Sequence, residues 1–141
     1  MRDTDARLIT LLKANAREPV ASLARKLDLA RSTVQERIAR LEREGVIRGY
    51  TLLVSDEAQA RNLRAVVMMA ADARQAERLA GELKRIPEVR ALSAVSGAYD
   101  MMALVEAETL ARMDAVLDRI GRAGGVTRTV SSIILSEKFS R

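Results

Sequence analysis

The chain contains no histidine and no cysteine among its 141 residues. The lack of histidine excludes an imidazole metal ligand, a histidine acid–base pair and a histidine-containing catalytic triad. The lack of cysteine excludes a disulfide framework and a thiolate nucleophile. A glycine-rich phosphate loop is also absent, because Gly121, Gly124 and Gly125 do not have the required spacing. We therefore expect that the protein is not an enzyme and that it uses no metal and no cofactor.

Aromatic residues are also scarce, at 2% of the chain, and tryptophan is absent. Binding of single-stranded nucleic acid by base stacking is therefore disfavoured. The N-terminus, MRDTDARLI, has no apolar signal core, and no apolar run approaches the length of a membrane span. We expect a cytoplasmic protein with no membrane partner.

Positive charge is abundant and unevenly distributed along the chain, whose net charge is +5. Residues 1–50 contain 11 Lys and Arg against 7 Asp and Glu, a net charge of +4. Residues 51–141 contain 13 against 12, a net charge of +1. This asymmetry predicts a polyanionic partner for the N-terminal part.

Residues 20–50 contain two short helical patterns separated by a tight turn. Only residues 28–31 lie between the patterns, so the two helices must cross steeply, as in a helix-turn-helix. An amphipathic helix that ends near Asn15 adds a third helix, on which the other two can rest. One apolar stripe runs along each of the two patterns, formed by Leu23, Ala24, Leu27, Val34, Ile38 and Leu41.

The polar face of the second helix carries residue types that contact double-stranded DNA. Hydroxyl and amide groups in the first turn suit base edges, and arginines farther along suit phosphates. Ser32 and Gln35 match a capping box, which predicts a helix start near Ser32, and a short strand is expected over residues 46–50. A plain helical hairpin with a solvated charged face is the alternative. The candidate DNA contacts are Arg31, Ser32, Thr33, Gln35, Glu36, Arg37 and Arg40.

The rest of the chain alternates strand and helix patterns in a βαββαβ order. Polar residues 55–62 separate this part from the first, so we predict a helix-turn-helix domain over 1–50, a strand and linker over 51–62, and a ferredoxin-like domain over 63–141. The fold class is α+β. The predicted strands are 64–71, 89–95, 101–105 and 126–135, and the predicted helices are 74–86 and 109–121.

Three of these strands are apolar on both faces, over residues 66–71, 101–105 and 133–135. A sheet with helices on one face should instead alternate apolar and polar residues. The second face therefore needs a cover. A second copy of the chain, packed sheet against sheet, is the simplest one, and a third layer from the N-terminal part is the alternative.

Three segments resemble the Lrp/AsnC family of feast/famine regulators. The segment RIARLEREGVIRGY matches the family run RxxRLExxGVIxGY, VSGAYD at 95–100 resembles its ligand-domain signature, and residues 127–129 resemble its ending. Asp28 stands where the family's turn usually has glycine, and Ala30 stands where it usually has a capping serine. Ser32 is the expected replacement cap.

The resemblance implies a DNA-binding transcriptional regulator that responds to a small effector, in most cases an amino acid. The loop at 95–100 would help to form the effector pocket between subunits of neighbouring dimers, with residues of the last strand. The Asp100 carboxylate could receive an ammonium group. The expected assembly is a homodimer that forms an octamer or another higher oligomer. The residues carried over are Gly97, Tyr99, Asp100, Thr127, Thr129 and Ser131.

Two alternatives to this function stay open at this point. One is an effector-binding assembly protein whose DNA specificity is weak or lost. The other is an enzyme similar to the sirohaem decarboxylases, which share the two-domain architecture. The absence of histidine argues against that enzyme, since histidines are expected near its tetrapyrrole.

Overall fold

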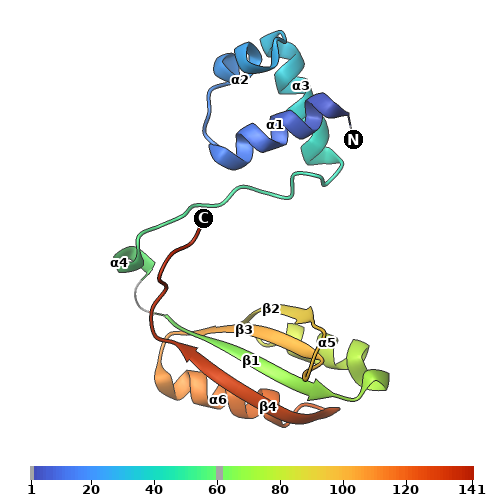
Figure 1. Ribbon diagram of the computed structural model, residues 1–141, viewed down its shortest axis with the longest axis vertical. Coiled ribbons are helices and arrows are strands. Elements are labelled where there is room, and N and C mark those ends of the chain that lie inside the picture. Colours follow the sequence, from blue (N-terminus) through green and yellow to red (C-terminus); the bar gives the residue numbers. More distant parts are fainter. Residues whose placement is uncertain (1, 60–61) are drawn as a thin grey trace. The chain divides into compact units, whose positions relative to one another are not determined.

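The computed structural model describes residues 2–59 and 62–141 (Figure 1). The chain divides into two compact units, Met1–Leu53 and Val54–Arg141, and each has its own apolar core. The elements in chain order are α1 (Asp3–Ala14), α2 (Val20–Leu27), α3 (Arg31–Arg43), α4 (Asp56–Gln59), β1 (Leu63–Ala71), η1 (Ala73–Gln75), α5 (Ala76–Lys84), β2 (Val89–Ala94), β3 (Met101–Ala107), α6 (Leu110–Gly121) and β4 (Val126–Ile134).

The first unit is a bundle of three helices, α1, α2 and α3, as the sequence pattern predicts. Apolar residues at helical spacing on all three helices meet in one cluster, which explains why the short helices are stable together. The buried members of this cluster are Leu8, Leu12, Leu23, Ala24, Leu27, Val34 and Leu41.

The turn between α2 and α3 is built on a left-handed residue. Asp28 has φ 54° and ψ 51°, and its N–H donates to the carbonyl oxygens of Ala24 and Arg25. The N–H of Leu29 also donates to Ala24, at 2.9 Å. A left-handed backbone costs most residues about 1–2 kcal/mol, and aspartate is among those that tolerate it better. Asp28 therefore takes the conformation that a glycine would take at lower cost.

The start of α3 corrects one prediction. The helix begins at Arg31, with Ala30 at the N-cap position and no side-chain cap. The N–H of Val34 already bonds to the Ala30 carbonyl oxygen at 3.1 Å, so Ser32 lies inside the first turn. The predicted capping box of Ser32 and Gln35 is therefore wrong, because the N-cap position is held by Ala30 and the helix starts at Arg31, one residue before Ser32.

The segment after α3 corrects a second prediction. Gly45 ends the helix at φ 71°, but residues 46–54 form no strand within the described part of the chain. A strand needs a neighbouring strand to pair with its N–H and C=O groups, and the described residues of the first unit contain no strand. The predicted linker contains α4, a single turn.

The second unit is a four-stranded antiparallel sheet with two main helices, which confirms the ferredoxin-like prediction. The strand order is β2-β3-β1-β4, so the first and third strands of the unit are central. The register pairs Met68 with Met102 and Val130, which places these three residues on one face. The elements differ from the predicted ranges mainly by one or two residues at their ends.

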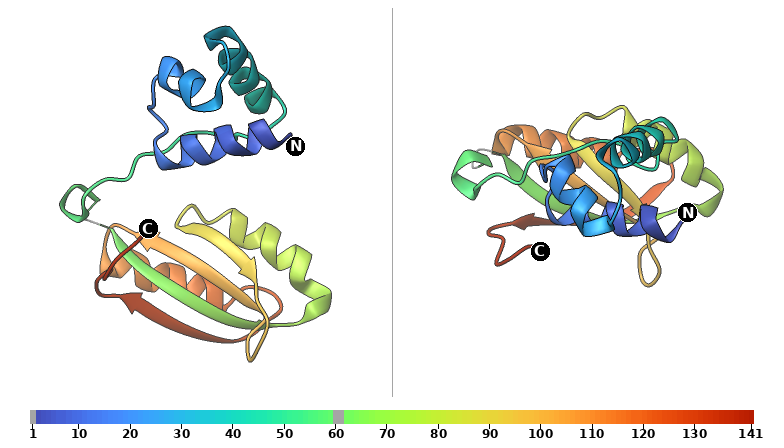
Figure 2. Two further views of the ribbon diagram at one scale, coloured as in Figure 1. Left: turned by 45° about the horizontal axis from the view of Figure 1, so that its top comes forward. Right: turned by 90° about the horizontal axis from the view of Figure 1, so that it is seen from above.

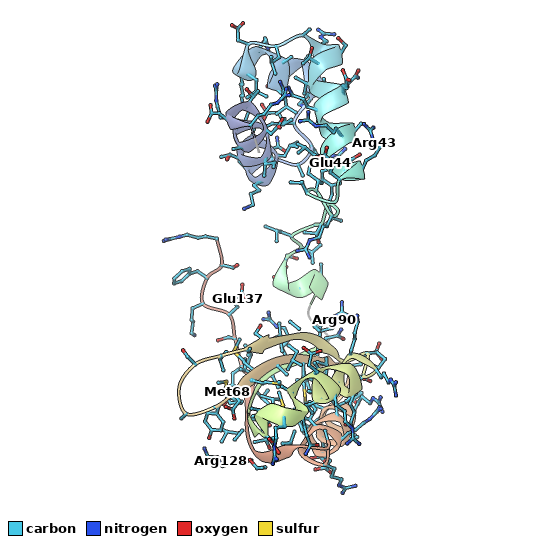
Figure 3. All side chains as sticks on the ribbon, turned by 90° about the vertical axis from the view of Figure 1, so that its right-hand side faces the viewer. Arg43, Glu44, Met68, Arg90, Arg128 and Glu137 are labelled. Carbon is cyan, nitrogen blue, oxygen red and sulfur yellow. The ribbon has the colours of Figure 1, made fainter. Side chains whose placement is uncertain are left out.

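The two faces of this sheet differ in their cover. Helices α5 and α6 lie on one face (Figures 1 and 2), where Val67, Met69 and Val105 are at most 1% exposed. The residues between them in the strands point to the other face, as Met68 does in Figure 3. We call this second surface the open face. Its larger apolar residues are Val66, Met68, Met102, Leu104, Val130 and Ile134.

Candidate nucleic-acid interface and ligand loop

Helix α3 has a buried side and an exposed side. Val34 and Leu41 are buried in the first core, and Ile38 packs against them. Of the seven predicted DNA contacts, four are exposed and three are half-buried. The exposed ones are Arg31, Ser32, Gln35 and Glu36, and the half-buried ones are Thr33, Arg37 and Arg40.

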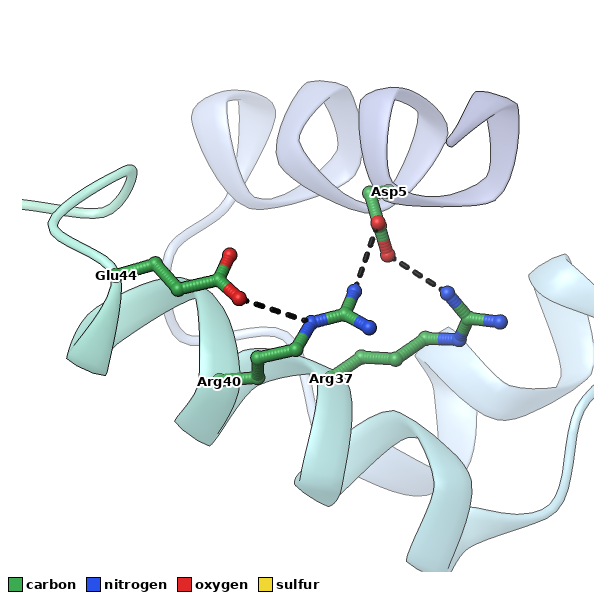
Figure 4. A network of polar contacts seen from close by, with 4 residues as sticks. All are labelled: Asp5, Arg37, Arg40 and Glu44. Carbon is green, nitrogen blue, oxygen red and sulfur yellow. Dashed lines mark hydrogen bonds and ion pairs between the residues drawn. The ribbon is translucent and has the colours of Figure 1, made fainter. Parts of the chain in front are cut away.

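Arg37 and Arg40 are bound within the protein (Figure 4). The Arg37 Nη1 atom donates to Asp5 Oδ1 at 2.7 Å, and the Arg40 Nη2 atom donates to Asp5 Oδ2 at 2.8 Å. The Asp5 side chain is 5% exposed, against 17% for Arg37 and 32% for Arg40. Arg40 also lies 3.9 Å from the Glu44 carboxylate. One carboxylate of α1 therefore holds two arginines of α3.

The two guanidinium groups keep Asp5 ionised despite its burial. Burial alone would raise the pKa of Asp5, but the hydrogen bond from Arg37 and the positive charges of Arg40 and Arg37 outweigh it. The pKa of Asp5 lies below its ordinary value of 3.8. Losing this carboxylate would leave two half-buried cations without their partner, a strongly destabilising change.

The role of Asp5 was not predicted from the sequence, although its position in α1 carries a signal. Asp5 lies on the same face of α1 as the buried residues Leu8 and Leu12, at the i, i+3 and i+7 positions. A carboxylate within an apolar stripe needs a buried partner. The partner could not be named from sequence because it lies 32 positions away.

Of the two basic residues of α2, Lys26 is paired within the described part of the protein and Arg25 is not. Lys26 pairs with Glu18, whose side chain is 8% exposed. Hydrogen bonds from Lys26 and Ser22 hold the pKa of Glu18 below its usual value. Arg25 is exposed and makes no ion pair with the residues that the structure describes.

The loop between β2 and β3 contains the predicted ligand signature. Gly97 has φ 117°, a backbone conformation that favours glycine, so the loop needs a glycine there. The N–H of Asp100 donates to the Met69 carbonyl oxygen at 2.8 Å, and Asp100 Oδ2 accepts from the N–H of Ala71 at 2.9 Å. Asp100 therefore fastens the loop to the end of β1 with one oxygen, and its other oxygen has no partner in the described residues.

Two contacts connect this region to β4. The Arg128 guanidinium lies 4.9 Å from the centre of the Tyr99 ring, within cation–π range. The Thr127 hydroxyl donates to the Ala70 carbonyl oxygen at 3.1 Å. Arg128 belongs to the open face, since it is the register partner of Ala70.

The predicted ligand residues on β4 are not all equally close to the loop. Thr129 pairs with Met69, whose carbonyl binds Asp100, so Thr129 lies at the loop end of the sheet. Ser131 pairs with Val67, two residues farther along β1. The structure therefore gathers Gly97, Tyr99, Asp100, Thr127 and Thr129 at one end of the sheet and leaves Ser131 farther away.

Comparison with known proteins assigns both units. The family model for the Lrp/AsnC ligand binding domain matches residues 64–141, and that for winged helix-turn-helix DNA-binding matches residues 1–48. The HTH-type transcriptional regulator Rv2324 of Mycobacterium tuberculosis is 32% identical over 140 residues, which cover 99% of this chain and 95% of Rv2324. This chain belongs to the Lrp/AsnC family.

Two further relatives of this Lrp/AsnC protein agree with the assignment. The HTH-type transcriptional regulator FL11 of Pyrococcus furiosus is 30% identical over 133 residues, covering 94% of this chain and 88% of FL11. The transcriptional regulator NMB0573 of Neisseria meningitidis, solved as a complex with L-Met, gives a TM-score of 0.81 at 25% identity, with coverage of 99% and 93%.

These findings confirm the family resemblance and remove support for an enzyme. The relatives are named as transcriptional regulators, so a sirohaem-decarboxylase activity has no basis in them. Within the described residues of the Lrp/AsnC chain, no helix is long and apolar enough to span a membrane, and no group of three or more acidic residues is placed to hold a metal ion.

Proposed function

We propose that the protein is a transcriptional regulator that binds double-stranded DNA through α3 and responds to a small effector. The DNA-binding part of this proposal rests on the exposed polar face of α3, which belongs to a helix-turn-helix unit with a net charge of +4. Family membership and the names of the relatives support it. The proposed contacts to base edges come from the exposed side chains Ser32, Gln35 and Glu36.

The open face of the sheet supports a dimer. Met102 and Leu104 are each 37% exposed and Val130 is 46% exposed, next to the half-buried Val66 and Met68. A contiguous apolar surface of this kind usually marks an interface. A two-fold dimer would carry two α3 helices, which suit two half-sites about 34 Å apart on a pseudo-palindromic duplex. Assembly of such dimers into an octamer or another higher oligomer is our further expectation.

The proposed DNA binding can be tested without knowing the target sequence. Random duplexes are enriched by binding to the purified full chain, and the affinity for the enriched sequence is compared with that for a scrambled one. Specific binding should exceed non-specific binding by about 10³-fold or more. A pseudo-palindrome in the enriched sequence would support the dimer. Equal affinity for both duplexes would contradict sequence-specific regulation and favour an assembly protein with lost DNA specificity.

The proposed effector is a free amino acid. Two findings support this class: the match to the Lrp/AsnC ligand binding domain and the L-Met complex of NMB0573. In this chain, the free oxygen of Asp100 is available for an ammonium group, and Tyr99 and Arg128 lie at the same end of the sheet. Binding between dimers would couple the effector to the arrangement of the DNA-reading units.

A thermal-shift screen against the twenty amino acids tests the effector class. A ligand at about 100 times its dissociation constant should stabilise the protein by about 2.7 kcal/mol. A selective shift would name the effector. If none of the amino acids shifts the unfolding temperature, the effector belongs to another chemical class or the second unit serves assembly alone.

Two substitutions at Asp100 separate its possible roles. Asp100→Asn keeps an oxygen that can accept from the Ala71 N–H but removes the negative charge. We expect this variant to keep its unfolding temperature and lose the ligand-induced shift, whereas Asp100→Ala should also loosen the loop. A normal shift in the Asp100→Asn protein would remove the carboxylate from the ligand site.

A further inference from the structure

We propose that Arg31 and Arg43 carry the phosphate contacts of α3, and that Arg37 and Arg40 serve to position the helix through Asp5. This inference rests on the proposed DNA binding and assigns its electrostatic part to particular residues. It divides Arg31, Arg37 and Arg40, which the sequence analysis predicted together as DNA contacts, and it adds Arg43.

Arg37 and Arg40, which we call the inner pair, are neutralised within the protein. Asp5 accepts hydrogen bonds from both Arg37 and Arg40, and Glu44 lies 3.9 Å from Arg40. Two cations and two carboxylates therefore form one cluster with no net charge (Figure 4). Because its positive charges are already paired, this cluster adds little to the attraction of a polyanion or to the release of counterions.

Arg37 is also poorly placed to reach a phosphate. Its side chain is 17% exposed, and its Nε atom is buried without a hydrogen-bond partner in the described residues. At about 100° per residue, Arg37 lies about 140° around the helix from Ser32. Its guanidinium therefore points toward α1 and away from the exposed polar face.

Arg31 and Arg43, which we call the outer pair, are exposed and, among the described residues, unpaired, where the inner pair is half-buried and paired. Arg31 and Arg43 are the first and last residues of α3, both are exposed, and neither forms an ion pair with the described residues. Arg43 lies within about 20° of Ser32 around the helix axis, and Arg31 lies about 40° from Gln35. Both arginines are thus aligned with the side chains proposed to face the bases.

The separation of the outer arginines also suits duplex DNA. Twelve residues of helix place their Cα atoms about 18 Å apart along the axis. The major groove is about 12 Å wide, and each arginine side chain adds reach beyond its own turn. A helix lying in the groove would therefore present base-contacting side chains between two arginines directed at phosphates on its margins.

The test uses the same substitution at all four positions, Arg→Gln, in the full chain. The probe is a fluorescently labelled 30-bp duplex of mixed sequence, titrated at several salt concentrations. Each phosphate contact contributes about 0.9 to the slope of log affinity against log salt. Arg31→Gln and Arg43→Gln should each lower the slope by about 0.9 for every α3 that engages the duplex, at an unchanged unfolding temperature.

Arg37→Gln and Arg40→Gln should instead lower the unfolding temperature and leave the slope unchanged. A lower slope in either of these variants, measured well below its unfolding temperature, would overturn the proposal. So would unchanged slopes in both Arg31→Gln and Arg43→Gln, a result that does not depend on whether the inner variants fold. Absence of salt-dependent binding in the unsubstituted protein would contradict the proposed function itself, which is a different outcome.

Discussion

At the residue scale, the buried carboxylate of Asp5 binds two arginines of the helix-turn-helix unit, Arg37 and Arg40. Its two hydrogen bonds join α1 to α3, so α3 is held by an ionic contact as well as by apolar packing. A buried ion pair of this kind contributes modestly to stability when complete but is costly when one partner is removed. The contact therefore favours one orientation of α3 over others.

The first prediction concerns Asp5→Asn. At neutral pH this substitution should lower the free energy of unfolding of the first unit by about 2 kcal/mol, since hydrogen bonds to charged groups are worth about 1.5–3 kcal/mol. The pKa of Asp5 is lowered in the folded protein, so its contribution is full above about pH 5 and is lost as the pH falls below 3.8. Amide hydrogen exchange in α1 and α3 measures this stability separately from the second unit.

Asp3→Asn is the matched control for this prediction, because Asp3 is exposed in the same first turn of α1. It should change stability by less than about 0.5 kcal/mol at neutral pH. If Asp5→Asn behaves like Asp3→Asn, or if its effect persists unchanged at pH 2, then the ion pair does not stabilise the folded state.

At the element scale, the turn between α2 and α3 determines how the two helices cross. Its left-handed residue is aspartate, which the family usually replaces with glycine. Asp28→Gly should raise the free energy of unfolding by about 0.5 kcal/mol, since relief of the unfavourable backbone is partly offset by the greater freedom of glycine in the unfolded chain. Asp28→Val should lower it by about 2 kcal/mol, because a β-branched residue tolerates positive φ poorly. Urea unfolding followed by circular dichroism measures both changes.

Asp28→Asn provides the reference for this pair, because asparagine tolerates the left-handed region about as well as aspartate. Equal stability in the Gly, Asn and Val variants would mean that residue 28 is not held at positive φ in the folded protein. The order Gly, Asn, Val from most to least stable is the expected result.

Some of the helices and strands could be predicted from the sequence, and others could not. The order of helices and strands follows from local apolar periodicity, and that is why the βαββαβ pattern and the three N-terminal helices were predicted correctly. The start of α3 was predicted wrongly because a serine can occupy a first turn without capping it. The strand expected at 46–50 was also wrong, since a strand is defined by a neighbour that its own sequence does not contain.

The candidate sites likewise contain some features that could be predicted from the sequence and some that could not. The exposure of candidate DNA contacts such as Ser32 and Gln35 follows from their helical phase alone. The pairing of Asp5 with Arg37 and the contact of Tyr99 with Arg128 join residues that are distant in sequence, so their partners depend on the fold. Asp100 was singled out from the sequence as a candidate ligand carboxylate in the loop, which stays a prediction. Its hydrogen bond to the Ala71 amide could not be foreseen without the strand order.

At the scale of the whole molecule, the open face is the surface through which we propose that the chain forms a dimer. Leu104→Glu places a charge at the centre of this face, opposite Val66 in the register. We expect the variant to be a monomer, because an unpaired carboxylate at an apolar interface opposes association. Leu110→Glu is the matched control, since Leu110 is 63% exposed on α6 and does not belong to the open face. Sedimentation velocity should show a dimer or larger species for the control and a monomer for Leu104→Glu.

The same pair of variants connects assembly to DNA binding. In a dimer, binding of one α3 raises the effective concentration of the second near its half-site, which can increase the overall affinity by about 10²–10⁴-fold. Leu104→Glu should therefore lose most of its affinity for a pseudo-palindromic duplex while keeping the affinity of a single unit for one half-site. Leu110→Glu should retain both. If Leu104→Glu still sediments as a dimer, the open face is not the interface. If it is a monomer with undiminished affinity, one helix-turn-helix unit is sufficient for DNA binding.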